Sequence, residues 1–181
     1  MLIILKTLHK LLKLLNSETA PSQLSAGIAF GMIVGLSPFF AWHNLVIFLL
    51  VFLLRVNLSM FFMATAFFAI IGFFMDPLFD RLGYFLLVEL DVARSLWIWI
   101  ASAPILPFFR LNNTVVMGSL ALSLITYFPV FVVAIWAIGQ YRKHWKEKIK
   151  DSKFMKWFKA TKLYGLYEKY QNFQEKWENL V

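Results

Sequence analysis

Apolar stretches separated by short polar or proline-containing segments make up the middle of the chain. Two of them, residues 59–75 and 114–139, approach or exceed the length of about 20 residues that a helix needs to cross a bilayer. Three others, residues 24–36, 45–54 and 95–104, are too short to cross. The pattern therefore predicts two membrane-crossing helices and several helices of about half that length.

Proline-containing loops follow two of the short stretches. Pro38 separates the first two, and Pro107 follows the third. Because proline breaks helices, the short helices around Pro38 predict a re-entrant hairpin that enters the bilayer and turns back. Such backbone is tolerated at membrane depth only where protein or a wet cavity surrounds it. Asp76-Pro77 predicts a sharp stop at the end of the first crossing helix.

The two proline loops match each other at the same spacing. The matching residues are Pro38, Phe39, Phe40, Asn44 and Val46 in the first loop and Pro107, Phe108, Phe109, Asn113 and Val115 in the second. Two units, residues 22–75 and 92–140, would each contain one crossing, so the second would enter from the opposite face. That is an inverted repeat, as in many transporters, whose broken helices handle the substrate. The alternative is a coincidental match in a plain bundle of three or four kinked helices.

Glycines recur at every fourth position of the first short helix. They are Gly27, Gly31 and Gly35. In lipid, helices associate by close packing, and small residues four apart let two backbones approach. The spacing predicts a tightly packed face, and the alternative is that this face moves as a gate.

Polar residues within the apolar region are candidates for a lipid path. His43 and Asn44 follow the first proline loop, and Arg55 and Asn57 precede the first crossing helix. A cation at the bilayer centre costs about 2.5–3.5 kcal/mol on insertion scales. Arg55 is therefore expected either to snorkel to the interface or to hold an anionic lipid headgroup.

The composition is that of a membrane protein. Hydrophobic residues make up 60% of the chain and charged residues 15%, with a mean hydropathy of +0.68, whereas soluble domains have about 45–50% and about 25%. The net charge of +8 is concentrated at the two ends of the chain. Basic segments beside membrane spans stay in the cytoplasm, so both termini are expected there and the number of crossings must be even.

Both ends predict amphipathic helices. In residues 1–21, lysines share one stripe of a helix, which is typical of a helix lying in the headgroup region; the alternative is packing on the protein's own core. In residues 141–181, basic and aromatic residues suit an anionic lipid leaflet better than nucleic acid. The lysines expected at that surface are Lys146, Lys150, Lys153, Lys156 and Lys159.

These patterns together predict an all-α polytopic integral membrane protein. It has two re-entrant helical hairpins, two crossing helices, a candidate inverted repeat, and amphipathic helices at both ends. The expected regions are residues 1–21, the membrane domain 22–140 and the tail 141–181.

Signatures of an enzyme are missing from the sequence. There is no cysteine, and the three histidines are far apart, so no metal site is expected. Asp76 and Asp80, beside Arg81, are expected to form a local ion-pair cluster rather than an acid/base dyad. We expect no catalysis, no cofactor and no nucleic-acid partner.

The run AGIAFGMIVGLSPFFAWHN, followed by LLRVNLS, resembles the bacterial membrane family catalogued as domain of unknown function (DUF) 2062. The resemblance covers about residues 23–84. The matching positions are Gly27, Gly31, Gly35, Pro38, His43, Arg55, Asn57 and Pro77. The chain departs from the family pattern at Ala41, where a glycine is usual, and at Asp76, where an asparagine is usual.

The resemblance implies a bacterial inner-membrane protein without an established activity. The chain is similar to a longer subgroup encoded beside a large, envelope-spanning protein that is itself similar to bridge-like lipid carriers. We therefore expect a non-enzymatic subunit that binds membrane lipids, anchors this partner and helps feed lipid to it. Relatives fused to glycosyltransferases favour an alternative, a stand-alone flippase for an anionic lipid such as a polyprenyl phosphate. A structural scaffold whose tail recruits cytoplasmic enzymes is the third possibility.

Overall fold

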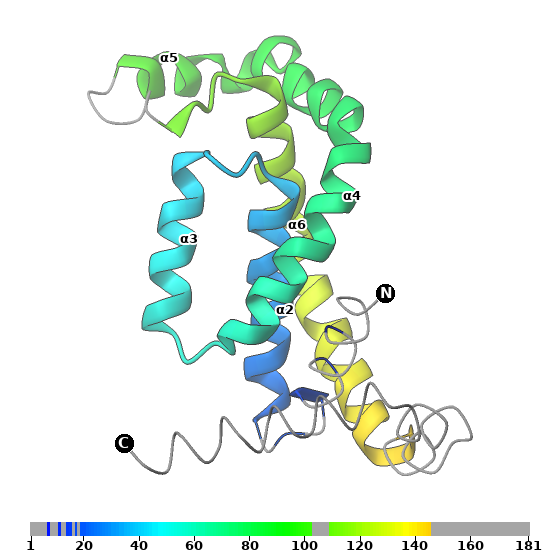
Figure 1. Cartoon of the computed structure of the whole chain (residues 1–181). Coiled ribbons are helices and arrows are strands. Elements are labelled where there is room, and N and C mark those ends of the chain that lie inside the picture. Colours follow the sequence, from blue (N-terminus) through cyan, green and yellow to red (C-terminus); the bar gives the residue numbers. More distant parts are fainter. Residues whose placement is uncertain are drawn as a thin grey trace. The chain divides into compact units, whose positions relative to one another are not determined.

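The structure is a computed structural model that describes residues 19–102 and 109–145, together with Thr7, Leu11, Leu14, Leu15 and Ser17. All regular elements in these residues are helical (Figure 1). In chain order they are α2 (Pro21–Leu36), α3 (Trp42–Leu53), α4 (Leu58–Tyr84), the π-helical turn η1 (Phe85–Glu89), the 3₁₀ turn η2 (Asp91–Ala93), α5 (Arg94–Ser102), α6 (Thr114–Gln140) and the π-helical turn η4 (Tyr141–Trp145). The all-α prediction is confirmed.

Two helical segments are long and apolar enough to cross a membrane. They are Leu58–Glu89, which joins α4 to η1, and Thr114–His144, which continues α6. The helices α2 and α3 have 16 and 12 residues, so at about 1.5 Å per residue they measure about 24 Å and about 18 Å. Both are shorter than a hydrocarbon core of about 30 Å.

The centre of the first compact unit, which ends at Gly139, is α2. It lies between α3, α4 and α6 (Figure 1). Ile33 belongs to a buried cluster with Val51 of α3 and Phe61 of α4. Phe30 packs on Tyr127 of α6, with their ring centroids 5.1 Å apart. Because neighbours cover α2 on several sides, its sequence is apolar all round, as expected of a buried helix.

Three glycines of α2 form its contact with α4. A Cβ added at Gly27, Gly31 or Gly35 would lie 2.9, 2.6 or 2.6 Å from a backbone carbonyl oxygen of the neighbouring helix segment. The carbonyls are those of Asn57, Phe61 and Thr65, in that order. Because the partners advance in the same direction as the glycines, α2 and α4 run parallel with their backbones touching. Small residues spaced by four are what permit this approach.

The last long helix, α6, runs antiparallel to α2 and α4. Near its start, Gly118 lies against Phe79 of α4. Near its end, Ile138 packs with Leu24 of α2 and Met60 of α4. The start of α2 and the end of α6 therefore lie at the same end of the first unit.

The helix α4 does not stop at Asp76-Pro77, and that expectation was wrong. It continues to Tyr84, and η1 extends it to Glu89. The first candidate repeat, residues 22–75, therefore ends inside a helix. Proline at position 77 removes one helical hydrogen bond, the one that the carbonyl of Phe73 would accept. Long membrane helices tolerate such a loss where neighbouring helices support them.

Support for the far part of α4 comes from α6. Phe79 is fully buried, and the hydroxyl of Thr114 donates a hydrogen bond to the Asp80 carboxylate. Gly83 lies directly against the backbone of Thr114. These contacts with α6, which is distant in sequence, stabilise the part of α4 that follows Pro77, where the local sequence predicted the end of the helix.

The second re-entrant hairpin is not formed by the described residues. Whereas α3 returns beside α2, α5 lies across the end of the bundle where α6 begins (Figure 1). The indole N–H of Trp97 donates to the carbonyl of Leu86, 2.8 Å away, and so ties α5 to the end of α4. The described parts of the two candidate repeats, residues 22–75 and 92–140, therefore differ in architecture. The inverted repeat is not seen in these residues. Pro107 and Phe108 lie outside the described residues.

The two ends of the chain are described only in part. At the N-terminus, Leu11, Leu14 and Leu15 pack against buried residues of α2, α4 and α6, which favours packing on the protein's own core. The stripe of lysines in that segment lies outside the described residues. Of the second unit, residues 140–145 are described, and the tail lysines from Lys146 onward lie outside them.

We expect Gly31→Leu to destabilise the protein, because its side chain would collide with the backbone of α4. Overpacking of this kind costs about 1–3 kcal/mol or more, which corresponds to a fall in Tm of several degrees, about 2–4 °C per kcal/mol at this size. The matched control is Gly139→Leu, because a Cβ at Gly139 meets nothing within 4 Å. Thermal melting in detergent measures both variants, and equal melting temperatures would contradict the glycine contact.

Candidate functional site

The segment Ser37–Trp42, which we call the aromatic loop, joins α2 to α3. Its side chains Phe39, Phe40 and Trp42 are 63%, 89% and 51% exposed. Aromatic residues are enriched at the boundary between hydrocarbon and headgroups. Exposed aromatic rings in a short loop are therefore a pattern typical of a membrane interface.

Asn44 holds the aromatic loop in place. It is 2% exposed, and its side-chain amide donates to the carbonyl oxygens of Pro38 and Phe39 at 3.0 and 3.1 Å. The backbone N–H of Ala41 also donates to the Pro38 carbonyl, 2.9 Å away. Asn44 is thus a positioning residue, which fixes where Phe39 and Phe40 project.

His43 lies beside Asn44 in the first turn of α3. It is 6% exposed, and neither ring nitrogen has a hydrogen-bond partner in the described residues. A buried polar group without a partner costs free energy, so the His43 ring is an unsatisfied polar group in the first turn of α3. Within residues 19–102 and 109–145, no cluster of three His, Asp or Glu residues offers a metal site.

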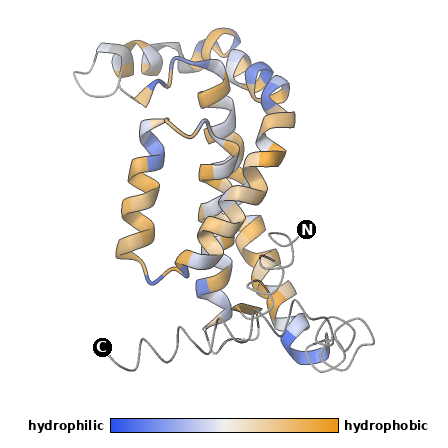
Figure 2. Cartoon of the chain, viewed as in Figure 1, coloured by the Kyte–Doolittle hydropathy of each residue, from blue (hydrophilic) through white to orange (hydrophobic). Residues whose placement is uncertain are grey.

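The outward face of α3 is a continuous apolar surface. Hydrophobic residues cover the helix beyond its first turn (Figure 2). The exposed large side chains on it are Leu45, Val46, Leu49, Leu50, Phe52 and Leu53. Only Ile47 and Val51, with His43 and Asn44, are buried against the rest of the protein.

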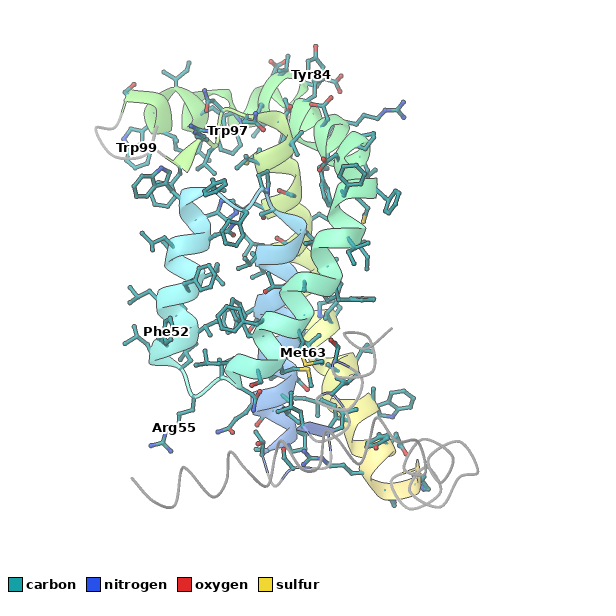
Figure 3. All side chains as sticks on the ribbon, in the orientation of Figure 1. Phe52, Arg55, Met63, Tyr84, Trp97 and Trp99 are labelled. Atoms are coloured by element: carbon teal, nitrogen blue, oxygen red, sulfur yellow. The ribbon has the colours of Figure 1, made fainter. Side chains whose placement is uncertain are left out.

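Arg55 lies at the opposite end of α3 from the aromatic loop (Figure 3), and Asn57 follows it at the start of α4. The side chain of Arg55 is exposed and points away from the helices. Asn57 caps α4 by accepting a hydrogen bond from the N–H of Met60, 2.9 Å away. About 18 Å of helix separates these residues from His43 and Asn44, so the structure does not bring the expected lipid-path residues together.

Asn113 has a different role from Asn44, although the two align in sequence. Its side chain caps α6 by accepting from the N–H of Val116, 3.0 Å away, as Asn57 does for α4. Phe109 is half-buried, and it precedes Arg110, whose φ of 52° is left-handed. The shared letters of the two loops therefore do not correspond to shared contacts.

The expected ion-pair cluster is not present in the described part of the chain. Asp80 accepts a hydrogen bond from Thr114 instead of pairing with Arg81. Sequence reasoning also missed Trp42, which could have been found as a third aromatic residue next to the proline loop, a position typical of an interfacial anchor.

A family model identifies the family of the chain. The family model described as "Uncharacterized protein conserved in bacteria (DUF2062)" matches residues 6–146. A protein of Treponema pallidum (strain Nichols), named "Uncharacterized protein", is 24% identical over 145 residues, which cover 80% of this chain and 89% of the relative. No solved structure matches the chain. Since the family model extends over most of the chain, from the N-terminal segment to the end of α6, the protein belongs to the DUF2062 family.

Proposed function

We propose that this protein is a non-enzymatic inner-membrane subunit that helps lipid leave the bilayer and anchors a large envelope-spanning partner that receives the lipid. The observation that carries the proposal is the short hairpin of α2 and α3, which ends in the exposed aromatic loop. This hairpin packs beside two helices, α4 and α6, that are long and apolar enough to cross a membrane.

A short hydrophobic flank perturbs the surrounding lipid. On the side of α3, the protein offers about 18 Å of apolar helix to a hydrocarbon core of about 30 Å. A bilayer adapts to such a mismatch by thinning locally. A lipid headgroup beside α3 then has less hydrocarbon to cross, and the rings of Phe39 and Phe40 disturb chain packing at that point.

The charge distribution supports an orientation with the aromatic loop toward the periplasm. Every lysine of the chain lies in residues 1–21 or 140–181. These segments connect to the start of α2 and the end of α6, which share one end of the first unit. By the positive-inside rule, that end belongs in the cytoplasm. The aromatic loop and α5 then face the periplasm.

The end that carries the aromatic loop and α5 also offers a surface that could anchor the partner. There, α5 exposes Ile98 and Trp99, which are 61% and 65% exposed, next to Val92, which is 90% exposed. Aromatic anchors of this kind dominate protein–protein interfaces.

The orientation is testable because the chain has no native cysteine. Single cysteines at Asp91 or Asn112 should react with a membrane-impermeant maleimide in spheroplasts. Single cysteines at Ser22 or Arg55 should react only after permeabilisation. All four positions lie outside the apolar helices or at their ends, and labelling of Arg55→Cys and Asn112→Cys from the same side would refute the orientation.

Lipid movement is testable in reconstituted vesicles. A double variant, Phe39→Ser with Phe40→Ser, should lower the rate of translocation of a fluorescent lipid severalfold, because the loop would no longer disorder the chains. The control is Phe67→Ser with Phe74→Ser, which removes two exposed rings from α4. Dithionite quenching measures the rate, and equal rates in both variants would remove the aromatic loop from the function.

Anchoring is testable by purification from native membranes. Ile98→Ser with Trp99→Ala should lose a large co-purifying periplasmic protein that the wild-type chain retains. The Phe67→Ser, Phe74→Ser control should retain it. If the wild-type chain moves lipid but brings down no such protein, the stand-alone flippase is the better description.

A further inference from the structure

Unpaired polar atoms are concentrated in the segment Ser37–Asn44, which we call the hairpin tip. Within the described residues, five buried side-chain atoms lack a hydrogen-bond partner, and four of them belong to this segment. They are the Ser37 hydroxyl, both ring nitrogens of His43 and the amide oxygen of Asn44. Buried polar groups are nearly always paired, so the closed hairpin tip carries an unusual share of unsatisfied groups.

His43 is the member of this set that can change its charge. The residue is 6% exposed, and both ring nitrogens are sealed from solvent. A neutral imidazole has one donor and one acceptor, whereas an imidazolium has two donors and a full positive charge. An unpaired charge costs far more to bury than an unpaired polar group. The closed hairpin tip therefore favours the neutral ring.

The neighbouring helices offer His43 no compensating partner. The helices that share a buried cluster with α3 are α2, α4 and α6. Neither α2 nor the aromatic loop contains a titratable residue. On α4, the exposed Asp76 lines a hollow beside Ser37 and Phe39. The charged and titratable residues of α4 and α6 are Asp76, Asp80, Arg81, Tyr84 and Tyr127, and none of them forms a hydrogen bond with the His43 ring.

The middle and far end of α3 are held more firmly than the hairpin tip. There, Val51 belongs to a buried apolar cluster with residues of α2. Phe48 packs edge-on against Phe61 of α4, with ring centroids 5.4 Å apart. The two hydrogen bonds that the Asn44 side chain donates stay within the hairpin tip and do not tie it to another helix. The start of α3 can therefore move away from α2 while the rest of the helix keeps its contacts.

We propose that the hairpin tip is a pH-sensitive switch, in which protonation of His43 moves the start of α3 away from α2 and opens the tip to water. In the open tip, water hydrates the imidazolium and supplies partners to the Ser37 hydroxyl and the Asn44 amide oxygen. The switch concerns the shape of the hairpin and does not require lipid movement, so it stands or falls separately from the proposed function.

The direction of the pH dependence follows from burial. An exposed histidine has a pKa of about 6.5, and burial lowers the pKa of His43, which lies outside the two helices long enough to cross. Over the pH range between these two pKa values, the open tip binds a proton that the closed tip does not. The closed tip is therefore fully favoured above the ordinary histidine pKa and loses stability as the pH falls below it. A single proton limits this change to about tenfold per pH unit.

Cysteine labelling measures the opening, because the chain has no native cysteine. Ser37→Cys places a thiol at a position that is 6% exposed, and Phe40→Cys places one at a position that is 89% exposed in the same loop. Each full-length variant, in an uncharged detergent, reacts with a maleimide between about pH 7.5 and about pH 5.5, below the usual thiol pKa. The ratio of the two rates cancels the pH dependence of the thiol. We expect this ratio to rise severalfold as the pH falls below about 6.5, and a flat ratio would overturn the switch.

Substitutions at His43 assign the effect to this ring. His43→Leu and His43→Gln, each combined with the two cysteines in turn, should make the ratio independent of pH, while His9 and His144 remain in both variants. Asp76→Asn, which removes the carboxylate beside the aromatic loop, should keep the wild-type profile. A rise that persists in both His43 variants, or that disappears in Asp76→Asn, would refute the role of His43.

Discussion

The backbone contact between α2 and α4 is the constraint on which the rest of the fold depends. Three glycines remove the side chains that would keep the helices apart, and the two parallel helices therefore touch along their backbones. Their neighbours then follow, because α3 must return beside α2 and α6 must close the remaining side. Buried apolar clusters that α2 shares with α3, α4 and α6 surround this contact.

In this arrangement, α3 contacts the other helices through only a few buried residues. Four residues of α3 are buried, and most of the others expose their side chains. The aromatic loop is nevertheless well defined, because Asn44 binds two of its carbonyls. A short helix with a lipid-facing surface and a fixed tip is the combination that the proposed lipid function needs.

Much of the fold could be predicted from sequence because it depends on local patterns. Length and hydropathy distinguish the two long helices from the three short stretches, and the spacing of Gly27, Gly31 and Gly35 predicts a packing face. Prediction failed where a distant segment decides the outcome. The helix α4 passes Pro77 because Thr114 and its neighbours support the far side. The matching letters of the two proline loops also predicted a shared structure that the contacts do not show. Asn44 and Asn113 occupy the same place in the pattern, but Asn44 donates to loop carbonyls and Asn113 accepts from a helix N–H.

The parallel contact also constrains the order of assembly. The helix α2 is made first, yet its binding face is completed only by a helix that leaves the ribosome some 20–50 residues later. With 16 residues it is too short to settle across the lipid by itself. The contact that fixes α2 can therefore form only after α4 has been synthesised, so the order of the helices in the chain delays the packing of α2.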